Sequence, residues 1–137
     1  EALLATLASQ KVTFTSLVPT HYIMMLGLPE ATKARHDVSA VKKLMISSAP
    51  ARKDTKLAIL ELFRNGRLYE LYGSTEAGGA TSILRPDEHN LDDEAKLQSC
   101  GRPLPLIAFR IVDGAGEDVP EGEPGELIVR APAITAP

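Results

Sequence analysis

The sequence predicts an α/β fold in which a partial parallel sheet with flanking helices is followed by an antiparallel β-hairpin portion. Up to about residue 84, short apolar or β-branched runs alternate with segments of helical periodicity, which is typical of βαβ units. Beyond Pro105, two strand-like runs enclose DGAGEDVPEGEPG, a stretch dense in turn residues that indicates a hairpin with an elaborated loop. We therefore expect an α/β lobe over 1–85, a polar connecting loop over 86–98 and an antiparallel β portion over 99–137.

The first elements follow from local residue types. Residues 1–9 show the apolar spacing of an amphipathic helix. The run VTFTSLV, residues 12–18, is rich in β-branched and aromatic residues and predicts a strand. Because proline suits the first turn of a helix, Pro19 predicts a second helix from about residue 20 to residue 26.

The next elements continue this alternation. A polar connection over 30–40 leads to an apolar run over 44–48, the second expected strand. Pro50 starts the helix with the clearest pattern, and an Asn-Gly pair at 65–66 ends it. The apolar residues of this helix recur at helical spacing: Leu57, Leu60 and Phe63. A third strand is expected over 67–72.

The remaining elements belong to the second part of the chain. Residues 85–98 are polar and acidic, which predicts a loop or a weak helix. Two strands are then expected over 107–112 and 126–130, and the turn-rich stretch between them favours antiparallel pairing.

The composition is that of an ordinary globular chain, with 44% hydrophobic residues, 24% charged residues and a formal net charge of −3. Like charges form no long block, so no nucleic-acid or anionic-membrane partner is expected. No apolar run approaches the length of a membrane span. The single cysteine, Cys100, excludes an internal disulfide and fits a reducing compartment, so we expect a cytoplasmic protein. The sequence begins inside a helical pattern without methionine, and we expect a piece of a longer chain.

The segment YGSTEAGG, residues 72–79, holds the residues that suggest chemistry. It directly follows an expected strand, at the carboxyl edge of the sheet, where open α/β sheets bind ligands. Its glycines allow close backbone approach, and its N–H groups and the hydroxyls of Ser74 and Thr75 suit a phosphate. Glu76 would repel a phosphate unless a cation stood between them, so the segment suggests a phosphate with bound Mg²⁺.

Two better-known motifs are not met in this segment. The Gly-Lys-[Ser/Thr] ending of a phosphate loop is absent, and so is the G-x-S-x-G of a nucleophile elbow. Spacing alone therefore leaves an alternative open, in which the segment is an inter-strand turn whose glycines serve only its geometry.

The segment YGSTEAG resembles the tyrosine-glycine-x-threonine-glutamate signature of the adenylate-forming superfamily. That superfamily includes acyl-CoA synthetases, beetle luciferases and the adenylation domains of peptide synthetases. Further stretches resemble the family in the same order along the chain: SLVPTHY (16–22), ISSAPA (46–51), GRPLP (101–105), FRIVD (109–113) and GEPGELIVR (122–130). The resemblance covers nearly the whole chain. It implies a central fragment of the large N-terminal domain, whose antiparallel portion is part of a β-barrel-like subdomain.

The resemblance implies a role for each residue of the signature. Tyr72 is expected to flank the adenine ring, and Gly73 to let the backbone pass close to the nucleotide. Thr75 is expected to hydrogen-bond the α-phosphate, and Glu76 to help hold Mg²⁺. These last two are the expected catalytic residues.

The resemblance also assigns residues outside the signature. Ser48, Ala49 and Pro50 are expected to line the adenine pocket, and the family usually has two glycines where this chain has serines at 47 and 48. On the acyl side, Gly78 and Gly79 are expected to bind substrate. His21 is expected either to border the acyl pocket or to be a structural histidine.

The implied reaction uses ATP, Mg²⁺ and coenzyme A. A carboxylic acid, expected to be a fatty acid, attacks the α-phosphorus of ATP, and coenzyme A then displaces AMP from the acyl-adenylate. The family's phosphate loop ending in Pro-Lys and its catalytic C-terminal lysine are not in this sequence, so the isolated chain is expected to be inactive. Two alternatives stay open: a non-catalytic nucleotide-binding module and a structural fragment with a relic site. Exposed sheet edges predict self-association of the isolated chain.

Overall fold

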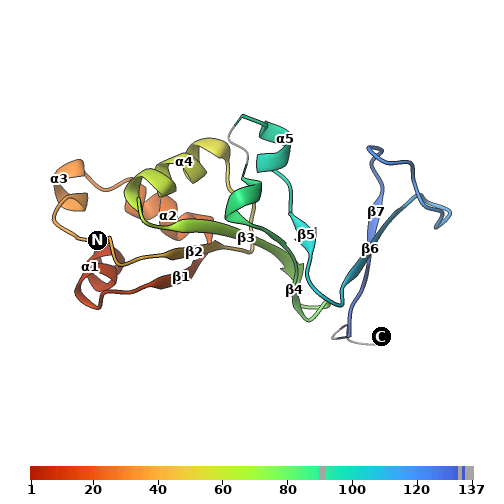
Figure 1. Ribbon diagram of the computed structural model, residues 1–137, viewed down its shortest axis with the longest axis horizontal. Coiled ribbons are helices and arrows are strands. Elements are labelled where there is room, and N and C mark those ends of the chain that lie inside the picture. Colours follow the sequence, from red (N-terminus) through yellow and green to blue (C-terminus); the bar gives the residue numbers. More distant parts are fainter. Residues whose placement is uncertain (90–91, 133, 135–137) are drawn as a thin grey trace.

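The computed structural model describes residues 1–89, 92–132 and 134. Figure 1 shows a helix-covered sheet that passes into a separate two-stranded ribbon. The elements, in chain order, are α1 (Ala2–Ser9), β1 (Phe14–Leu17), α2 (Pro19–Leu26), α3 (Glu30–Lys33), β2 (Lys43–Ile46), α4 (Lys53–Leu62), β3 (Arg67–Ser74), β4 (Gly79–Leu84), the 3-10 helix η1 (Pro86–Glu88), α5 (Glu94–Leu97), β5 (Arg102–Pro103), β6 (Ala108–Val112) and β7 (Glu126–Arg130).

The main sheet has five strands in the order β1-β2-β3-β4-β5. The first three strands are parallel, with Leu17 opposite Ile46 and Ile46 opposite Glu70. The carboxyl ends of β1, β2 and β3 therefore meet at one edge of the sheet. This confirms the expected α/β class with a partial parallel sheet.

The other two strands of the sheet correct the sequence-based prediction. Residues beyond 72 were expected to form a ligand loop, but β3 continues to Ser74 and Gly79–Leu84 forms β4, antiparallel to β3. The short strand β5 then pairs antiparallel with β4. The parallel pattern therefore ends at β3, because a tight turn after β3 sends the chain back along the same sheet.

Two element boundaries also differ from the expectation. The first strand is shorter, because only Phe14–Leu17 pairs with β2. Helix α4 begins at Lys53 rather than at Pro50, because Arg52 keeps extended backbone angles, φ −70° and ψ 158°. The helix α2 lies where it was predicted, whereas α3 (Glu30–Lys33) is a short helix that was not predicted and lies inside the expected polar connection.

The core lies between the parallel strands and the helices. Both crossover connections step in the same direction across the sheet, and such connections are right-handed, so α2 and α4 lie on the same face. Tyr22 of α2 and Phe63, the residue directly after α4, meet edge to face there, with ring centroids 6.3 Å apart and planes at 89°. The Tyr22 hydroxyl shares a 2.8 Å hydrogen bond with Thr15, which satisfies the polar tip of this buried ring.

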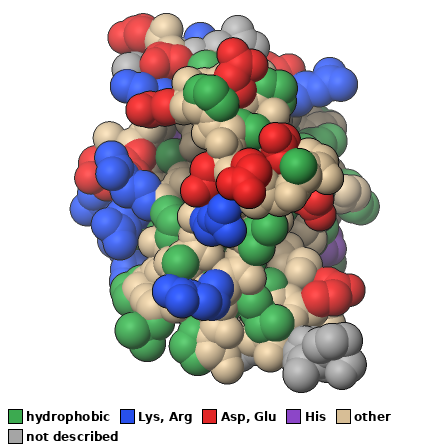
Figure 2. Space-filling model, turned by 90° about the vertical axis from the view of Figure 1, so that its right-hand side faces the viewer, with side chains coloured by type: hydrophobic (Ala, Val, Ile, Leu, Met, Phe, Trp, Pro, Cys, Tyr) green, Lys and Arg blue, Asp and Glu red, His purple; other side chains and the backbone are tan. Residues whose placement is uncertain are grey.

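The ribbon formed by β6 and β7 confirms the predicted antiparallel portion. Its register runs from Ala108 opposite Arg130 to Val112 opposite Glu126. The long connection between these strands carries several exposed acidic residues: Asp113, Glu117, Asp118, Glu121 and Glu123. Figure 2 looks onto this end of the molecule and shows acidic side chains gathered over its middle and upper parts. The connection between β6 and β7 therefore carries a net negative charge.

The connection between the sheet and the ribbon is irregular, as expected from its polar sequence. It contains the short helices η1 and α5, and residues 90 and 91 of the expected 86–98 loop lie outside the described residues. Among the residues that the structure describes, no helix combines the length and the apolar character needed to cross a bilayer.

Candidate functional site

The signature segment forms a tight β-hairpin at the edge where β2 and β3 end. The N–H of Gly78 donates to the carbonyl of Thr75 at 3.0 Å, and the N–H of Ala77 donates to Ser74 Oγ at 3.2 Å. These two bonds close the turn between β3 and β4, so the hairpin tip holds Thr75 and Glu76 exposed to solvent.

Gly73 lies where the two strands of this hairpin come unusually close. The β3–β4 register shifts between Tyr72 and Gly73, the mark of a bulge. A Cβ atom at Gly73 would lie 1.9 Å from the carbonyl oxygen of Gly79 and 2.8 Å from the Cα of Ala80. Both distances are far below van der Waals contact, so only glycine fits at residue 73 in this hairpin.

The segment after β2 approaches the hairpin from the neighbouring strand. Ser48 has a φ of +70°, in the left-handed region that side chains rarely adopt. The resemblance places a glycine of the family here, and the backbone conformation explains why a glycine is favoured. The Ser47 and Ser48 hydroxyls lie 3.5 Å apart on this bend.

Two hollows meet where the signature hairpin adjoins the end of β2. The hairpin hollow, of about 560 Å³, is lined by residues 47–48, 71–76, 79 and 80. The strand hollow, of about 450 Å³, is lined by residues 48–50, 70–73 and 98–100. Tyr72 lines both hollows and is 47% exposed, so its ring is free to contact a ligand.

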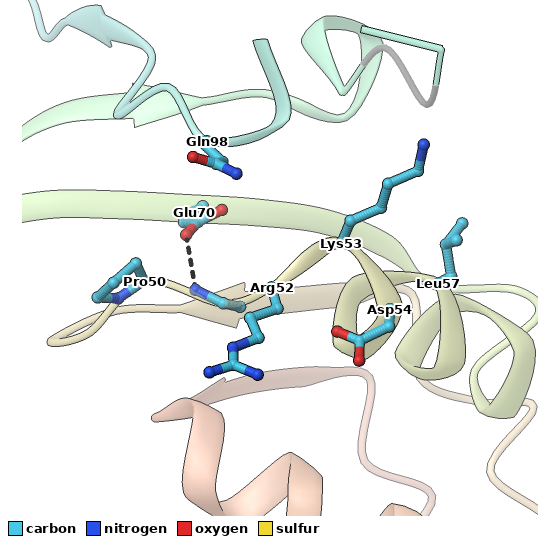
Figure 3. A pocket seen from close by; sticks show the side chains of 8 residues that line it. Pro50, Arg52, Lys53, Asp54, Leu57, Glu70 and Gln98 are labelled. Carbon is cyan, nitrogen blue, oxygen red and sulfur yellow. Dashed lines mark hydrogen bonds between the residues drawn. The ribbon is translucent and has the colours of Figure 1, made fainter. Parts of the chain in front are cut away.

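A third hollow, the helix hollow, opens beside the strand hollow at the start of α4. It measures about 760 Å³ and shares Pro50, Glu70 and Gln98 with the strand hollow. Figure 3 shows Arg52, Lys53 and Asp54 around it, and a hydrogen bond from the backbone of the segment after Pro50 to Glu70. This bond joins the Ala51 N–H to Glu70 Oε1 at 3.4 Å.

Most of the residues expected to form the site lie together around these hollows. The strand hollow contains Ser48, Ala49, Pro50, Tyr72 and Gly73, and the hairpin hollow contains Thr75, Glu76 and Gly79.

Two of the expected substrate-binding residues lie apart. His21 is exposed in the first turn of α2 and lines neither the hairpin hollow nor the strand hollow. Gly78 lies in the hairpin turn, with a φ of +79°, and lines neither hollow.

The structure adds residues that the sequence analysis did not select. Glu70 and residues 98–100 line the strand hollow, although 98–100 lies far along the chain from the signature. The sequence did contain one signal for Glu70, since a carboxylate in the middle of a strand that is otherwise largely apolar requires a partner.

The charge of Glu76 suits a cation beside a phosphate. Hydrogen bonds from its own N–H and from the Ser74 hydroxyl lower the pKa of Glu76, so the carboxylate is ionised at neutral pH. In the described part of the chain, no three His, Cys, Asp or Glu side chains form a metal cluster. A single carboxylate still fits Mg²⁺, which protein sites commonly hold through one or two carboxylates together with substrate phosphates.

Comparison with known proteins decides the family. The profile of the AMP-binding enzyme family matches residues 1–136. The chain belongs to the AMP-binding enzyme family. This confirms the resemblance to adenylate-forming enzymes that the signature and the five further stretches carry.

Members of the AMP-binding enzyme family resemble this chain over nearly its whole length. The indoleacetate–CoA ligase of Aromatoleum aromaticum is 34% identical over 126 residues, which cover 91% of this chain and 23% of that enzyme. The feruloyl-CoA synthase of an Amycolatopsis species is 32% identical over 133 residues, 97% of this chain and 26% of that enzyme. The structure of the amide bond synthetase McbA from Marinactinospora thermotolerans matches with a TM-score of 0.83 and 30% identity, covering 97% of this chain and 26% of that one. The chain therefore spans about a quarter of the length of these AMP-binding relatives.

Proposed function

We propose that the full-length protein containing this segment is an ATP-dependent acid–CoA ligase. It activates a carboxylic acid as an acyl-adenylate and transfers the acyl group to coenzyme A. The observation that carries the proposal is the meeting of two hollows at Tyr72 and Gly73, with the residues of the adenylate-forming signature around them. Membership of the AMP-binding enzyme family supports it.

The two hollows differ in the chemistry of their linings, and this difference supports binding of different parts of ATP in each hollow. The strand hollow, with Ala49, Pro50 and the Tyr72 ring, offers flat and apolar contacts and is the proposed adenine pocket. The hairpin hollow, with Ser74, Thr75 and Glu76, offers hydroxyls and a charge and is the proposed phosphate side. Ser48 lines both hollows, and we propose that its backbone N–H binds the nucleotide.

The proposed chemistry needs no covalent nucleophile from the protein. The carboxylate oxygen of the acid attacks the α-phosphorus of ATP, and pyrophosphate leaves. The thiol of coenzyme A then attacks the acyl carbonyl, and AMP leaves. Thr75 donates its hydroxyl to the α-phosphate in this scheme, and Glu76 is the proposed ligand of Mg²⁺, which when bound neutralises phosphate charge.

The names of related enzymes suggest the kind of acid. Relatives named for indoleacetate, for ferulate and for medium- or long-chain fatty acids match this chain. We propose a carboxylic acid with an apolar body, with a fatty acid as the first substrate to test. Gly79 is the proposed border of the acyl side, and Gly78 and His21 are also proposed to contact the acid.

The proposal extends to the setting of the protein. We propose that it works in the cytoplasm, and that residues 1–85 and 99–137 belong to two subdomains joined by 86–98. The strand β1 and the ribbon β6–β7 leave edges without a partner in the described part of the chain, so we also propose that the isolated chain self-associates.

Isothermal titration of ATP·Mg²⁺ into this chain, with ATP–pyrophosphate exchange by the full-length protein, tests the proposed function. Thr75→Ala should weaken ATP binding or exchange roughly ten- to hundredfold, because a hydrogen bond to the charged phosphate is lost. Glu76→Ala should weaken them by a similar factor, because the proposed carboxylate ligand of Mg²⁺ is lost. Glu117→Ala removes an equally exposed carboxylate from the remote β6–β7 loop and should change nothing. Binding by the full-length protein without exchange would favour the nucleotide-binding module. Neither binding nor exchange would favour a relic site.

A further inference from the structure

The buried face of α4 contains a lysine at a position where burial of an apolar side chain would cost less free energy. Lys56 and Ile59 share this face, and Lys56 is 1% exposed. Burying an ammonium group removes its hydration, and this cost is met only by close partners. Leucine at this position would avoid the cost of desolvating a charge. The role of Lys56 must therefore lie in the contacts that its ammonium group makes.

The partners of Lys56 come from two segments that flank the strand hollow. Its ammonium forms an ion pair with Glu70 of β3 and donates a hydrogen bond to the backbone carbonyl of Leu97 at the end of α5. The other carboxylate oxygen of Glu70 accepts the N–H of Ala51 at 3.4 Å (Figure 3). Through one charge, therefore, Lys56 connects three separate segments of the chain.

These three segments continue directly into the three walls of the strand hollow. Ala51 follows the wall at 48–50, Glu70 begins the wall at 70–73, and Leu97 precedes the wall at 98–100. Lys56 itself does not line the strand hollow. It therefore lies behind the hollow and acts on the walls through Glu70 and the Leu97 carbonyl.

We propose that Lys56 is a positioning residue of the nucleotide pocket. Its ion pair and its backbone hydrogen bond fix the spacing of the three walls before the nucleotide binds, so little ordering remains to be done on binding. This inference rests on the proposed function, because it takes the strand hollow as the adenine side.

The test compares ATP with the acid as substrates of the full-length protein. In ATP–pyrophosphate exchange, Lys56→Met should raise the KM for ATP roughly tenfold or more, as displacement of binding groups does. The KM for the acid should stay within about twofold, because Gly79, the proposed border of the acyl side, does not line the strand hollow whose walls Lys56 connects. A loss of general stability would instead raise both KM values or lower kcat alone.

A second variant keeps the test valid if Lys56→Met leaves Glu70 as a destabilising lone charge. Lys56→Met with Glu70→Gln removes both charges, and replacing a buried ion pair by neutral groups is often tolerated. This double variant should melt close to the wild type and still show the raised KM for ATP. Because Glu70 lines the hollow, Glu70→Gln is also measured alone, and its effect should be smaller than that of the double variant.

Lys33 provides a matched control. It also pairs with a glutamate, Glu30, and donates to a backbone carbonyl, that of Leu26 at 3.1 Å, but it lies on α3 away from the strand hollow. Lys33→Met should leave both KM values unchanged.

Two outcomes would overturn the inference about Lys56. One is a folded Lys56→Met or double variant with the wild-type KM for ATP. The other is a double variant no worse than Glu70→Gln alone. If the wild-type protein shows no exchange at all, the proposed function fails instead, and calorimetric ATP binding by the same variants still decides the role of Lys56.

Discussion

Replacing Gly73 by alanine should test the close approach inside the signature hairpin. The added Cβ would lie 1.9 Å from the Gly79 carbonyl oxygen, a backbone atom that moves only if β3 and β4 separate. Overpacking costs about 1–3 kcal/mol, and a strained hairpin hydrogen bond adds about 1 kcal/mol. We therefore expect Gly73→Ala to lower the free energy of unfolding by roughly 2–4 kcal/mol, which corresponds to a fall in Tm of roughly 7–14 °C.

Urea unfolding followed by far-ultraviolet circular dichroism measures this change, since the chain has no tryptophan to report by fluorescence. Gly114→Ala is the matched control, because a Cβ there meets no atom within 4 Å. It should change the free energy of unfolding by no more than about 0.5 kcal/mol. If Gly73→Ala and Gly114→Ala unfold at the same urea concentration, the two strands do not approach as closely as described.

Two further predictions concern Ser48 and the acidic loop. Ser48→Gly should stabilise the chain by about 0.5–1 kcal/mol in urea unfolding, because its φ of +70° costs a side chain more than the extra flexibility of glycine costs. Ser47→Gly lacks this gain, and equal effects of the two changes would contradict the reasoning. The N–H groups of Glu117 and Ala115 donate hydrogen bonds to the Asp113 carboxylate and lower its pKa. The stabilisation from these bonds is fully present above the ordinary aspartate pKa of about 4, and it is lost as the pH falls through the lowered pKa of Asp113. The stability difference between the wild type and Asp113→Asn should therefore shrink on acidification, and a difference independent of pH would refute this.

The sequence predicted the parallel half of the fold better than the antiparallel half of the main sheet. Short apolar runs separated by helical periodicity leave little choice but βαβ units, and β1, β2 and β3 appear where these runs lie. The strand β4 was missed because Gly79, which begins it, was assigned to the ligand segment together with the signature. Local pattern does not distinguish a glycine that approaches a ligand from a glycine that approaches a neighbouring strand, as Gly73 does.

The residues of the candidate site could be selected from the sequence where they form one contiguous motif. They were missed where residues distant in the sequence come together in the fold. Tyr72, Gly73 and Thr75 follow from the signature alone. Glu70 and Lys56 do not, because their pairing across 14 positions depends on which face of α4 turns inward. The helical spacing drew attention to Leu57, which is 40% exposed in the structure, whereas Lys56 beside it is buried. An ion pair therefore overrides the apolar pattern at this position of the helix.

The strand order of the main sheet bears on how a newly made chain acquires its fold. Each strand from β2 to β5 hydrogen-bonds to the strand that precedes it in the chain. Among the strands that the structure describes, none of the main sheet is inserted between two strands made earlier, and each pairing closes only a short length of polypeptide. The wall at 98–100 is made after β1 to β4 and immediately before β5. Residues 98–100 therefore form the last of the three walls of the strand hollow to be synthesised, after the four strands β1 to β4.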